Sequence, residues 1–381
     1  MLTEKEKTEA LKLLMETIQF VTVNPDGNEK ELAEYIAATL KSNGCPAQVH
    51  SFAPQRANVT ARLAGHSPGQ ALLLNGHLDT VPFGSAEEWK MPPDKATLQN
   101  GKLYGRGASD MKSGLCALLY AFLLLLRQKF VPKHDIIFAA TADEESQGLG
   151  AQDLLSAGIM KEVKAVLIAE PTGGQIGVAS KGALWLEITV YGKTSHGAYP
   201  EQGLNAAQIA LELYLECSRL ISGNKGNSYF NGSSCTLTQI KSGVKANVVP
   251  DRCIMTLDVR TVPGENALKF FEQGKQIIKE RYAEVRIEHQ ILNHRIPVEV
   301  SSDDVLIKEL SDAVERVQGT PPKLVGTGFF SDASLLLLDK MLPCVLFGPG
   351  NSEQAHKPNE YVYVEAYFKA IESLYHFLSN Q

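Results

Sequence analysis

Short apolar runs alternate with longer stretches of helical spacing in the first and last parts of the chain. Four of these runs are too short for helices and predict buried strands, at residues 71–74, 136–142, 165–169 and 345–347. Residues 115–126 form the most apolar stretch, which predicts a buried helix because a membrane span requires about 20 residues. Strands that alternate with helices favour an α/β fold, a mostly parallel sheet with helices on both faces.

The pattern changes in the middle of the chain. Strands are predicted at residues 184–191, 235–240, 253–259 and 285–291, and helices at 205–221 and 266–282. The resulting order βαββαβ is that of a ferredoxin-like unit. A chain of 381 residues also exceeds the size at which a single core usually keeps growing. We therefore predict a larger domain of residues 1–180 and 294–381, and an inserted domain of residues 181–293.

Composition and charge narrow the choice of partners and compartment. A formal net charge of -6 provides no large positive field, so we expect no nucleic-acid partner. The six cysteines show no metal-ligand spacing and fit reduced thiols. Residues 1–20 carry charges ahead of apolar residues at helical spacing, which predicts a surface helix rather than a signal peptide. We expect a cytoplasmic protein without a membrane partner.

Acids and histidines follow the predicted strands of the larger domain. The carboxyl ends of parallel strands lie along one edge of a sheet, where ligands bind. Side chains from distant parts of the sequence would therefore meet there. These residues are His77 and Asp79 after the first strand, Glu144 and Glu145 after the second, Glu170 after the third, and His356 beyond the fourth.

Each candidate also has an ordinary interpretation as a turn, cap or solvent-facing residue. Asp110 fits the N-cap of the following helix, and the pair Glu144 and Glu145 fits a solvated loop. Several such coincidences at one sheet edge are improbable, and the set as a whole favours a metal site.

Imidazole and carboxylate ligands without cysteine suit zinc, cobalt or manganese. Two ions bridged by a carboxylate would activate water and polarise a carbonyl. Asp79 is placed to orient the His77 imidazole.

Four segments together carry a family resemblance. They are GHLDTVP at 76–82, GRGASDMKSG at 105–114, DEE at 143–145 with Gly148, and AEP at 169–171. In this order they resemble the dinuclear zinc aminoacylase and carboxypeptidase family, and within it the acetylornithine deacetylase and succinyl-diaminopimelate desuccinylase group. The similarity extends over nearly the whole chain. It implies a zinc-exopeptidase-like fold whose insertion serves as a lid and dimerisation domain.

The resemblance implies a role for each residue of the metal site. Asp110 would bridge two zinc ions, for which cobalt or manganese can substitute. His77 and Glu170 would complete one site, and Glu145 and His356 the other. Glu144 would act as the general base and acid. A cis peptide bond between Asp110 and Met111 is also implied.

Further residues are implied to bind the substrate. In the inserted domain, GKTSHG at 192–197 is similar to the family's lid motif, in which His196 would stabilise the oxyanion across a homodimer interface. Asn247 and Arg260 match positions that contact the substrate carboxylate, and Gly350 provides a turn open to it. The alternatives are an ordinary loop histidine, a surface ion pair of Arg260 with Asp258 or Glu265, and a plain turn.

The substrate expected from the resemblance is a small N-acyl amino acid. A dipeptidase or carboxypeptidase would use the same metals and the same chemistry. The segment 330–334, FSDAS, lacks the arginine that follows the corresponding aspartate in many desuccinylases. A metal-free binding protein is disfavoured because every ligand and Glu144 is present, and a dinuclear phosphoesterase because its usual Asn-His-Asp/Glu clusters are missing.

Overall fold

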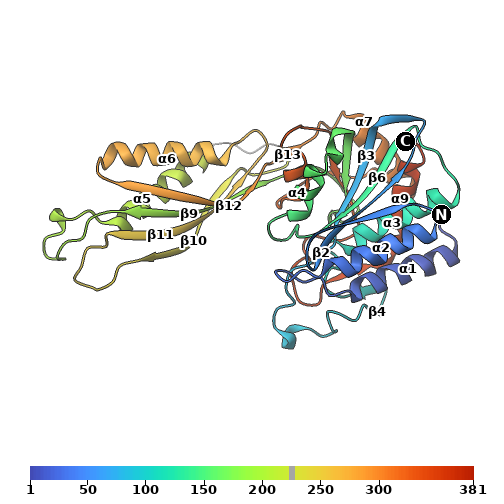
Figure 1. Ribbon diagram of the computed structural model, residues 1–381, viewed down its shortest axis with the longest axis horizontal. Coiled ribbons are helices and arrows are strands. Elements are labelled where there is room, and N and C mark those ends of the chain that lie inside the picture. The colour runs from blue at the N-terminus through green and yellow to red at the C-terminus, as the bar shows by residue number, and fades with distance from the viewer. Residues whose placement is uncertain (223–227) are drawn as a thin grey trace. The chain divides into compact units, whose positions relative to one another are not determined.

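The computed structural model describes residues 1–222 and 228–381 (Figure 1). Two compact units are present. The larger unit consists of Met1–Val178, Glu299–Val325 and Ser331–Gln381, and the smaller of Ala179–Val298 and Gly326–Phe330. The short segment Gly326–Phe330 was expected in the larger domain but groups with the smaller unit, so the chain passes between the units more often than a simple insertion requires.

A nine-stranded sheet forms the larger unit, in the order β1-β2-β6-β3-β7-β15-β8-β13 with β14 beside β8. The four central strands β6, β3, β7 and β15 run parallel, which confirms the predicted mostly parallel sheet. Strands β1, β2 and β8 join antiparallel at the two sides. The strands are β1 (Ala47–Ala53), β2 (Arg56–Leu63), β3 (Ser67–His77), β6 (His134–Thr141), β7 (Val163–Ile168), β8 (Ile176–Ser180), β13 (Val298–Glu299), β14 (Leu324–Thr327) and β15 (Cys344–Leu346).

Helices cover the sheet because its central strands are apolar on both faces. Figure 1 shows α4 on one side of the sheet, and α1, α3 and α9 on the other. Helix α3 is buried along almost its whole length, as its apolar sequence predicts. No helix within residues 1–222 and 228–381 is long and apolar enough to span a membrane. The helices are α1 (Glu4–Gln19), α2 (Glu29–Ser42), α3 (Lys112–Arg127), α4 (Leu149–Ser156), α7 (Val305–Gln318), α8 (Ala333–Leu336) and α9 (Val364–Leu378).

A small three-stranded sheet, not predicted from the sequence, lies in the same unit. It has the order β16-β5-β4, with β4 (Thr97–Gln99), β5 (Lys102–Tyr104) and β16 (Tyr361–Tyr363). Strand β5 leads into the loop that carries Asp110, and β16 follows the loop that carries His356. The antiparallel pairing of Tyr361 with Tyr104 therefore ties these two loops together.

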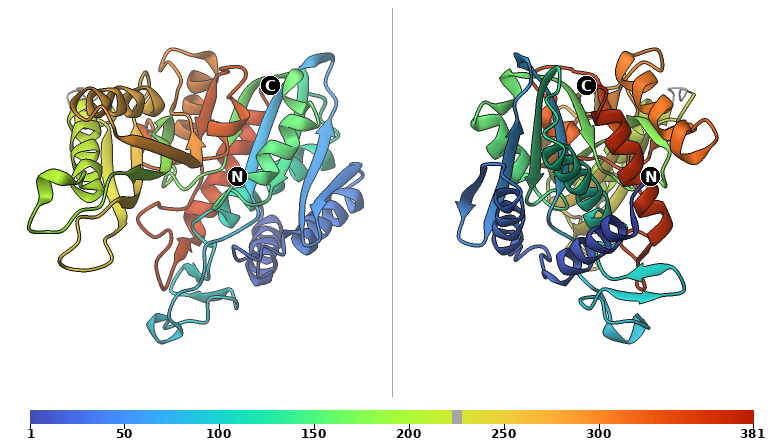
Figure 2. Two further views of the ribbon diagram at one scale, coloured as in Figure 1. Left: turned by 60° about the vertical axis from the view of Figure 1, so that its left-hand side comes forward. Right: turned by 90° about the vertical axis from the view of Figure 1, so that its right-hand side faces the viewer.

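The smaller unit has the predicted βαββαβ order and a four-stranded antiparallel sheet, β10-β11-β9-β12. Alternate residues of β9 and β11 are buried and pack with α5 and α6 in one apolar core. Figure 2 shows both helices against the same face of this sheet. The elements are β9 (Gly182–Tyr191), α5 (Ala206–Ser222), β10 (Ser234–Ser242), β11 (Arg252–Thr261), α6 (Ala267–Arg281) and β12 (Arg286–Arg295).

Candidate metal centre

The predicted ligands meet at the carboxyl edge of the parallel strands. His77 is the last residue of β3 and pairs in register with Thr141, the last residue of β6. Glu144 and Glu145 follow β6, and Glu170 follows β7. Parallel strands that end together place these side chains at one edge, as the sequence pattern predicts.

Asp110 lies at the centre of the cluster. Its Oδ1 is 3.3 Å from His77 Nε2, and its Oδ2 is 3.3 Å from His356 Nε2. His356 Nε2 is also 2.9 Å from Glu145 Oε1. Each oxygen of the Asp110 carboxylate thus faces a different histidine.

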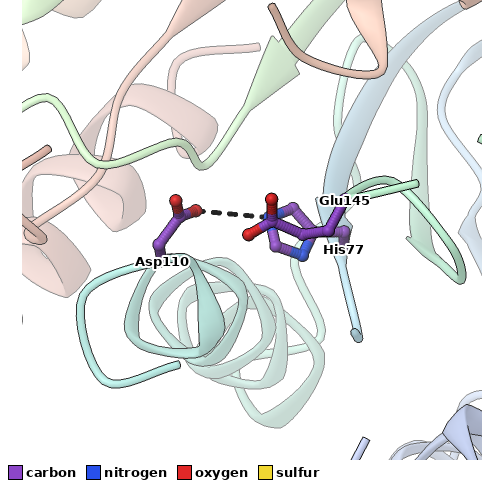
Figure 3. Close-up of side chains that lie close together, drawn as sticks. All are labelled: His77, Asp110 and Glu145. Atoms are coloured by element: carbon purple, nitrogen blue, oxygen red, sulfur yellow. Dashed lines mark hydrogen bonds and ion pairs between the residues drawn. The ribbon is translucent and has the colours of Figure 1, made fainter. Parts of the chain in front are cut away.

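Three of the ligand candidates form a compact group. One ligand atom each from His77, Asp110 and Glu145 lies within 4.8 Å of the others. Figure 3 shows these three side chains close together. His356 joins this group through its contacts with Asp110 and Glu145. Glu170 falls outside the group, although it is buried at the end of the neighbouring strand.

The chemistry of these residues fits a metal ion. Glu144 and Glu170 are 4% and 3% exposed, and Glu144 Oε1 has no hydrogen-bond partner among the residues the structure describes. A buried carboxylate is costly unless a cation or a donor compensates its charge. Imidazoles and carboxylates without a thiol are the donors preferred by divalent zinc, cobalt or manganese. The site therefore has both the donors and the excess of acid that a divalent cation satisfies.

The pKa values of the clustered side chains are shifted in both directions. Burial raises the pKa of Glu144 well above its usual range, and burial together with the charge of Asp110 does the same for Glu170. Burial opposes ionisation of Asp110, but hydrogen bonds from His356 and His77 hold its pKa well below the usual range. Hydrogen bonds to Asp110 and Glu145 raise the pKa of His356 to about 10. A bound cation would displace protons from the groups whose pKa is raised, because metal ligands bind in their deprotonated forms.

The Asp110 loop is held by a buried ion pair that the sequence analysis missed. Glu360 Oε1 accepts hydrogen bonds from the main-chain N–H of Ser109 at 2.8 Å and of Asp110 at 3.0 Å. Its Oε2 accepts from Arg106 Nη1 at 2.7 Å. Met111, not Asp110, is the N-cap residue of α3, so the structure does not support a capping role for Asp110. The Asp110–Met111 peptide bond is cis, as the resemblance implied.

Glycines allow the main chain to pack closely around Asp110. A Cβ atom at Gly350 would lie 2.0 Å from the carbonyl oxygen of Ser109, and one at Gly114 would lie 1.8 Å from that of Ala169. Any side chain at either position would force these segments apart. The side of Gly350 on which a Cβ atom would lie is thus occupied by the chain that carries Asp110.

Asp79 does more than orient an imidazole. His77 Nδ1 is 3.0 Å from the main-chain oxygen of Asp79 and 3.7 Å from its Oδ1. The two carboxylate oxygens instead accept the main-chain N–H groups of Glu144 and Glu145, both at 3.0 Å. The Asp79 carboxylate therefore acts mainly on the segment that presents the two glutamates.

The remaining predicted residues belong to the smaller unit. His196 is exposed, and its Nδ1 accepts a hydrogen bond from Ala198 N at 3.0 Å. Asn247 lies beside it, because its carbonyl accepts from Gly197 N at 2.8 Å. Arg260 makes the alternative contact considered above, a two-pronged ion pair with Asp258 at 2.8 and 3.1 Å.

Residues 73–380 match the model of peptidase family M20/M25/M40, so the chain belongs to this family. It is 31% identical to a probable succinyl-diaminopimelate desuccinylase of Staphylococcus aureus strain N315, over 97% of this chain and 96% of the relative. It is 28% identical to an uncharacterized metallohydrolase of Methanocaldococcus jannaschii, over 97% of this chain and 98% of that relative.

Solved structures share the fold. An M20 family metallo-carboxypeptidase from Sulfolobus solfataricus superposes with a TM-score of 0.77 at 22% identity, over 97% of this chain and 98% of that one. Human carnosine dipeptidase 1 superposes with a TM-score of 0.72 at 17% identity, over 99% of this chain and 96% of that one. Family membership makes the chain a hydrolase of amide bonds that uses a metal cofactor.

Proposed function

We propose that the chain is a dinuclear zinc amidohydrolase that cleaves small N-acyl amino acids, similar to acetylornithine deacetylase and succinyl-diaminopimelate desuccinylase. The observation that carries this proposal is the Asp110 carboxylate, which presents one oxygen to His77 and the other to His356. Such an arrangement fits a carboxylate shared between two metal ions. The relative named as a probable desuccinylase, similar along almost the full chain, supports the substrate class.

Each proposed metal position combines Asp110 with two further residues. His77 and Glu170 would hold one ion, and Glu145 and His356 the other. Cobalt or manganese would substitute for zinc, because the same nitrogen and oxygen donors suit them. When bound, such ions polarise the amide carbonyl and lower the pKa of a water molecule.

Glu144 is the proposed general base and acid. It would take a proton from the attacking water and deliver it to the nitrogen of the leaving amine. Its Oε1 is buried and has no hydrogen-bond partner in the described part of the chain, so no neighbour competes for it. Burial raises the pKa of Glu144 well above the usual range, so its carboxyl group can hold the transferred proton.

The smaller unit is the proposed lid and dimerisation domain. His196 would stabilise the oxyanion, and Asn247 and Arg260 would bind the substrate carboxylate, for which a planar guanidinium is well suited. The main chain at Gly350 would approach the same carboxylate. Strand β10 is an edge of its sheet, where unpaired main-chain groups can pair with a second copy. Ile240 on β10 and Leu215 on α5 are exposed apolar residues that a homodimer would cover.

A cytoplasmic location fits the thiols. All six cysteines are free and buried in the structure, as expected in a reducing compartment.

A dipeptidase or carboxypeptidase is the second candidate. It would use the same ligands and Glu144. The sequence Asp332-Ala333-Ser334 lacks the arginine found there in many desuccinylases, which weakens the resemblance to that group. The solved structures of similar fold include a carboxypeptidase and a dipeptidase.

A substrate panel distinguishes the two candidates. Purified protein loaded with zinc, cobalt or manganese is assayed with N-acetylornithine, N-succinyl-diaminopimelate and a set of dipeptides. We expect the highest kcat/KM with an N-acyl amino acid. A higher kcat/KM with dipeptides would favour the second candidate over the deacylase. The absence of amide hydrolysis by the metal-loaded protein would refute both proposals.

A further inference from the structure

A buried polar network lies behind Asp79, outside the predicted ligand set. Its centre is Arg56, the first residue of β2, whose side chain is 11% exposed. Arg56 Nη1 donates to Glu29 Oε1 at 3.0 Å and to Asp143 Oδ1 at 2.5 Å. Its Nη2 donates to Asn24 Oδ1 at 2.9 Å and to the main-chain oxygen of Pro25. The guanidinium thus donates to four acceptors from three segments of the chain.

Asn24 connects this guanidinium to Asp79. The asparagine is 6% exposed, and its Nδ2 donates to Asp79 Oδ2 at 2.5 Å. Its orientation is determined by its partners, because arginine can only donate and an ionised carboxylate can only accept. Asn24 therefore accepts a hydrogen bond from Arg56 and donates one to Asp79, and so links these two side chains.

The network ends on the two glutamates of the metal centre. Asp79 Oδ1 accepts from Glu144 N, and Asp79 Oδ2 accepts from both Glu145 N and Asn24. Asp143, which precedes them, has φ of 68° and is held directly by Arg56. Arg56 therefore restrains this three-residue segment at its start directly, and at its other two residues through Asn24 and Asp79.

We infer that Asn24 and Arg56 are positioning residues for the reaction, which fix the main chain of Glu144 and Glu145 from behind through Asp79 and Asp143. The inference rests on the proposed roles of Glu144 as base and Glu145 as ligand. In the described part of the chain, neither Asn24 nor Arg56 forms a hydrogen bond or ion pair with a proposed metal ligand. Outer groups of this kind orient the groups that do the chemistry, and their loss typically costs about 10–100-fold in metal affinity or activity.

Asn24→Asp tests the connection without a change in size. The variant keeps an oxygen towards Arg56 but replaces the donor that faces Asp79 by a second carboxylate oxygen. Asp79 then loses a hydrogen bond and gains a repulsive neighbour. We expect kcat at saturating Co²⁺ to fall about 10–100-fold with KM unchanged. We expect the affinity of the metal-free protein for Co²⁺, measured by visible absorption, to fall as well, because Glu145 is held by the same oxygen.

Asn43→Asp is the matched control. Asn43 likewise links an arginine to an oxygen acceptor, with Oδ1 accepting from Arg127 Nε at 3.0 Å and Nδ2 donating to Thr39 O at 2.9 Å. It caps the end of α2, and none of its side-chain hydrogen bonds within the described residues involves Asp79. The same change of atom should leave kcat and Co²⁺ affinity at the wild-type values. If Asn24→Asp does not fold, Asn24→Ala removes the donor without adding a charge, and the same falls are expected to be smaller.

A second background separates positioning from general destabilisation. In Glu144→Ala protein at saturating Co²⁺, Asn24→Asp should lower the residual kcat by a clearly smaller factor than in wild type, because one of the two residues that it positions is already missing. An equal fold loss in both backgrounds, or wild-type kcat and Co²⁺ affinity in Asn24→Asp, would overturn the inference. Failure of the proposed function has a different signature, namely no hydrolysis by wild type or full activity of Glu144→Ala, and Co²⁺ affinity then still tests the role of Asn24.

Discussion

Removal of Glu360 should destabilise the larger unit and release Asp110. Glu360 and Arg106 form an ion pair whose side chains are 1% and 3% exposed, and the carboxylate also accepts two main-chain N–H groups. In Glu360→Ala the Arg106 guanidinium stays buried without its carboxylate, which typically costs about 3–5 kcal/mol. Each main-chain N–H that loses its acceptor costs about 1–3 kcal/mol. These costs overlap, since one local rearrangement relieves both, so we expect a loss of about 3–5 kcal/mol in total.

A surface ion pair provides the matched control. Arg62 and Glu162 are in contact at 2.6 Å, but their side chains are 43% and 49% exposed. Exposed pairs contribute about 0–1 kcal/mol, so Glu162→Ala should be nearly neutral although it also removes a carboxylate from an arginine. Glu360→Gln gives an intermediate case, because the amide oxygen can still accept from Ser109 and Asp110 while the charge is lost.

The assay is urea unfolding of metal-free protein, so that differences in bound metal do not contribute. The chain has two tryptophans, Trp89 in the larger unit and Trp185 in the smaller. A Trp185→Phe background leaves Trp89, which stacks 5.1 Å from Arg106, as the fluorescent reporter. If Glu360→Ala unfolds with the same free energy as Glu162→Ala, the buried ion pair does not hold this loop and the reasoning is wrong.

Three further predictions concern the proposed chemistry. A strong chelator should abolish amide hydrolysis, and zinc, cobalt or manganese should restore it; full activity at verified zero metal content would contradict the metal site. Glu144→Gln should lower kcat about 10²–10⁴-fold with both ions retained, and loss of metal would show that Glu144 rather than Glu145 is a ligand. His196→Ala should lower kcat about 10²–10³-fold. A mixture of His196→Ala and Glu144→Ala that exchanges subunits should regain activity, and no recovery despite proven exchange would rule out action across a dimer.

The central parallel strands of the larger unit are predicted from the sequence, whereas β2, which buries polar residues, is missed. The central strands appear as uninterrupted apolar runs, which only a buried position explains. Strand β2 instead alternates with Arg56, Asn58 and Thr60. Asn58 is fully buried and satisfied by Gly150 O and Asp153. A buried polar residue whose partners are distant in sequence is indistinguishable from a surface residue in the pattern.

The same limit applies to the candidate site. The proposed ligands are recognisable because several acids and histidines follow strands that end at one edge. Glu360, Asn24 and Arg56 have no such position, and their partners lie far away in sequence, as in the contact between Glu360 and Ser109. Near-complete burial of an arginine and a glutamate is the signal that would have found Arg106 and Glu360, and it exists only in the folded chain.

The candidate metal centre is supported by two carboxylates that bind main-chain N–H groups. Glu360 holds the segment of Asp110 in this way, and Asp79 holds the segment of Glu144 and Glu145. Because each carboxylate binds the main chain, it fixes the backbone of a proposed ligand and leaves the side-chain oxygens of that residue available to a cation. The compact arrangement of His77, Asp110 and Glu145 is therefore a property of the chain itself. The repulsion among these buried acids is the energetic cost of that arrangement, and a divalent cation is the species that relieves it.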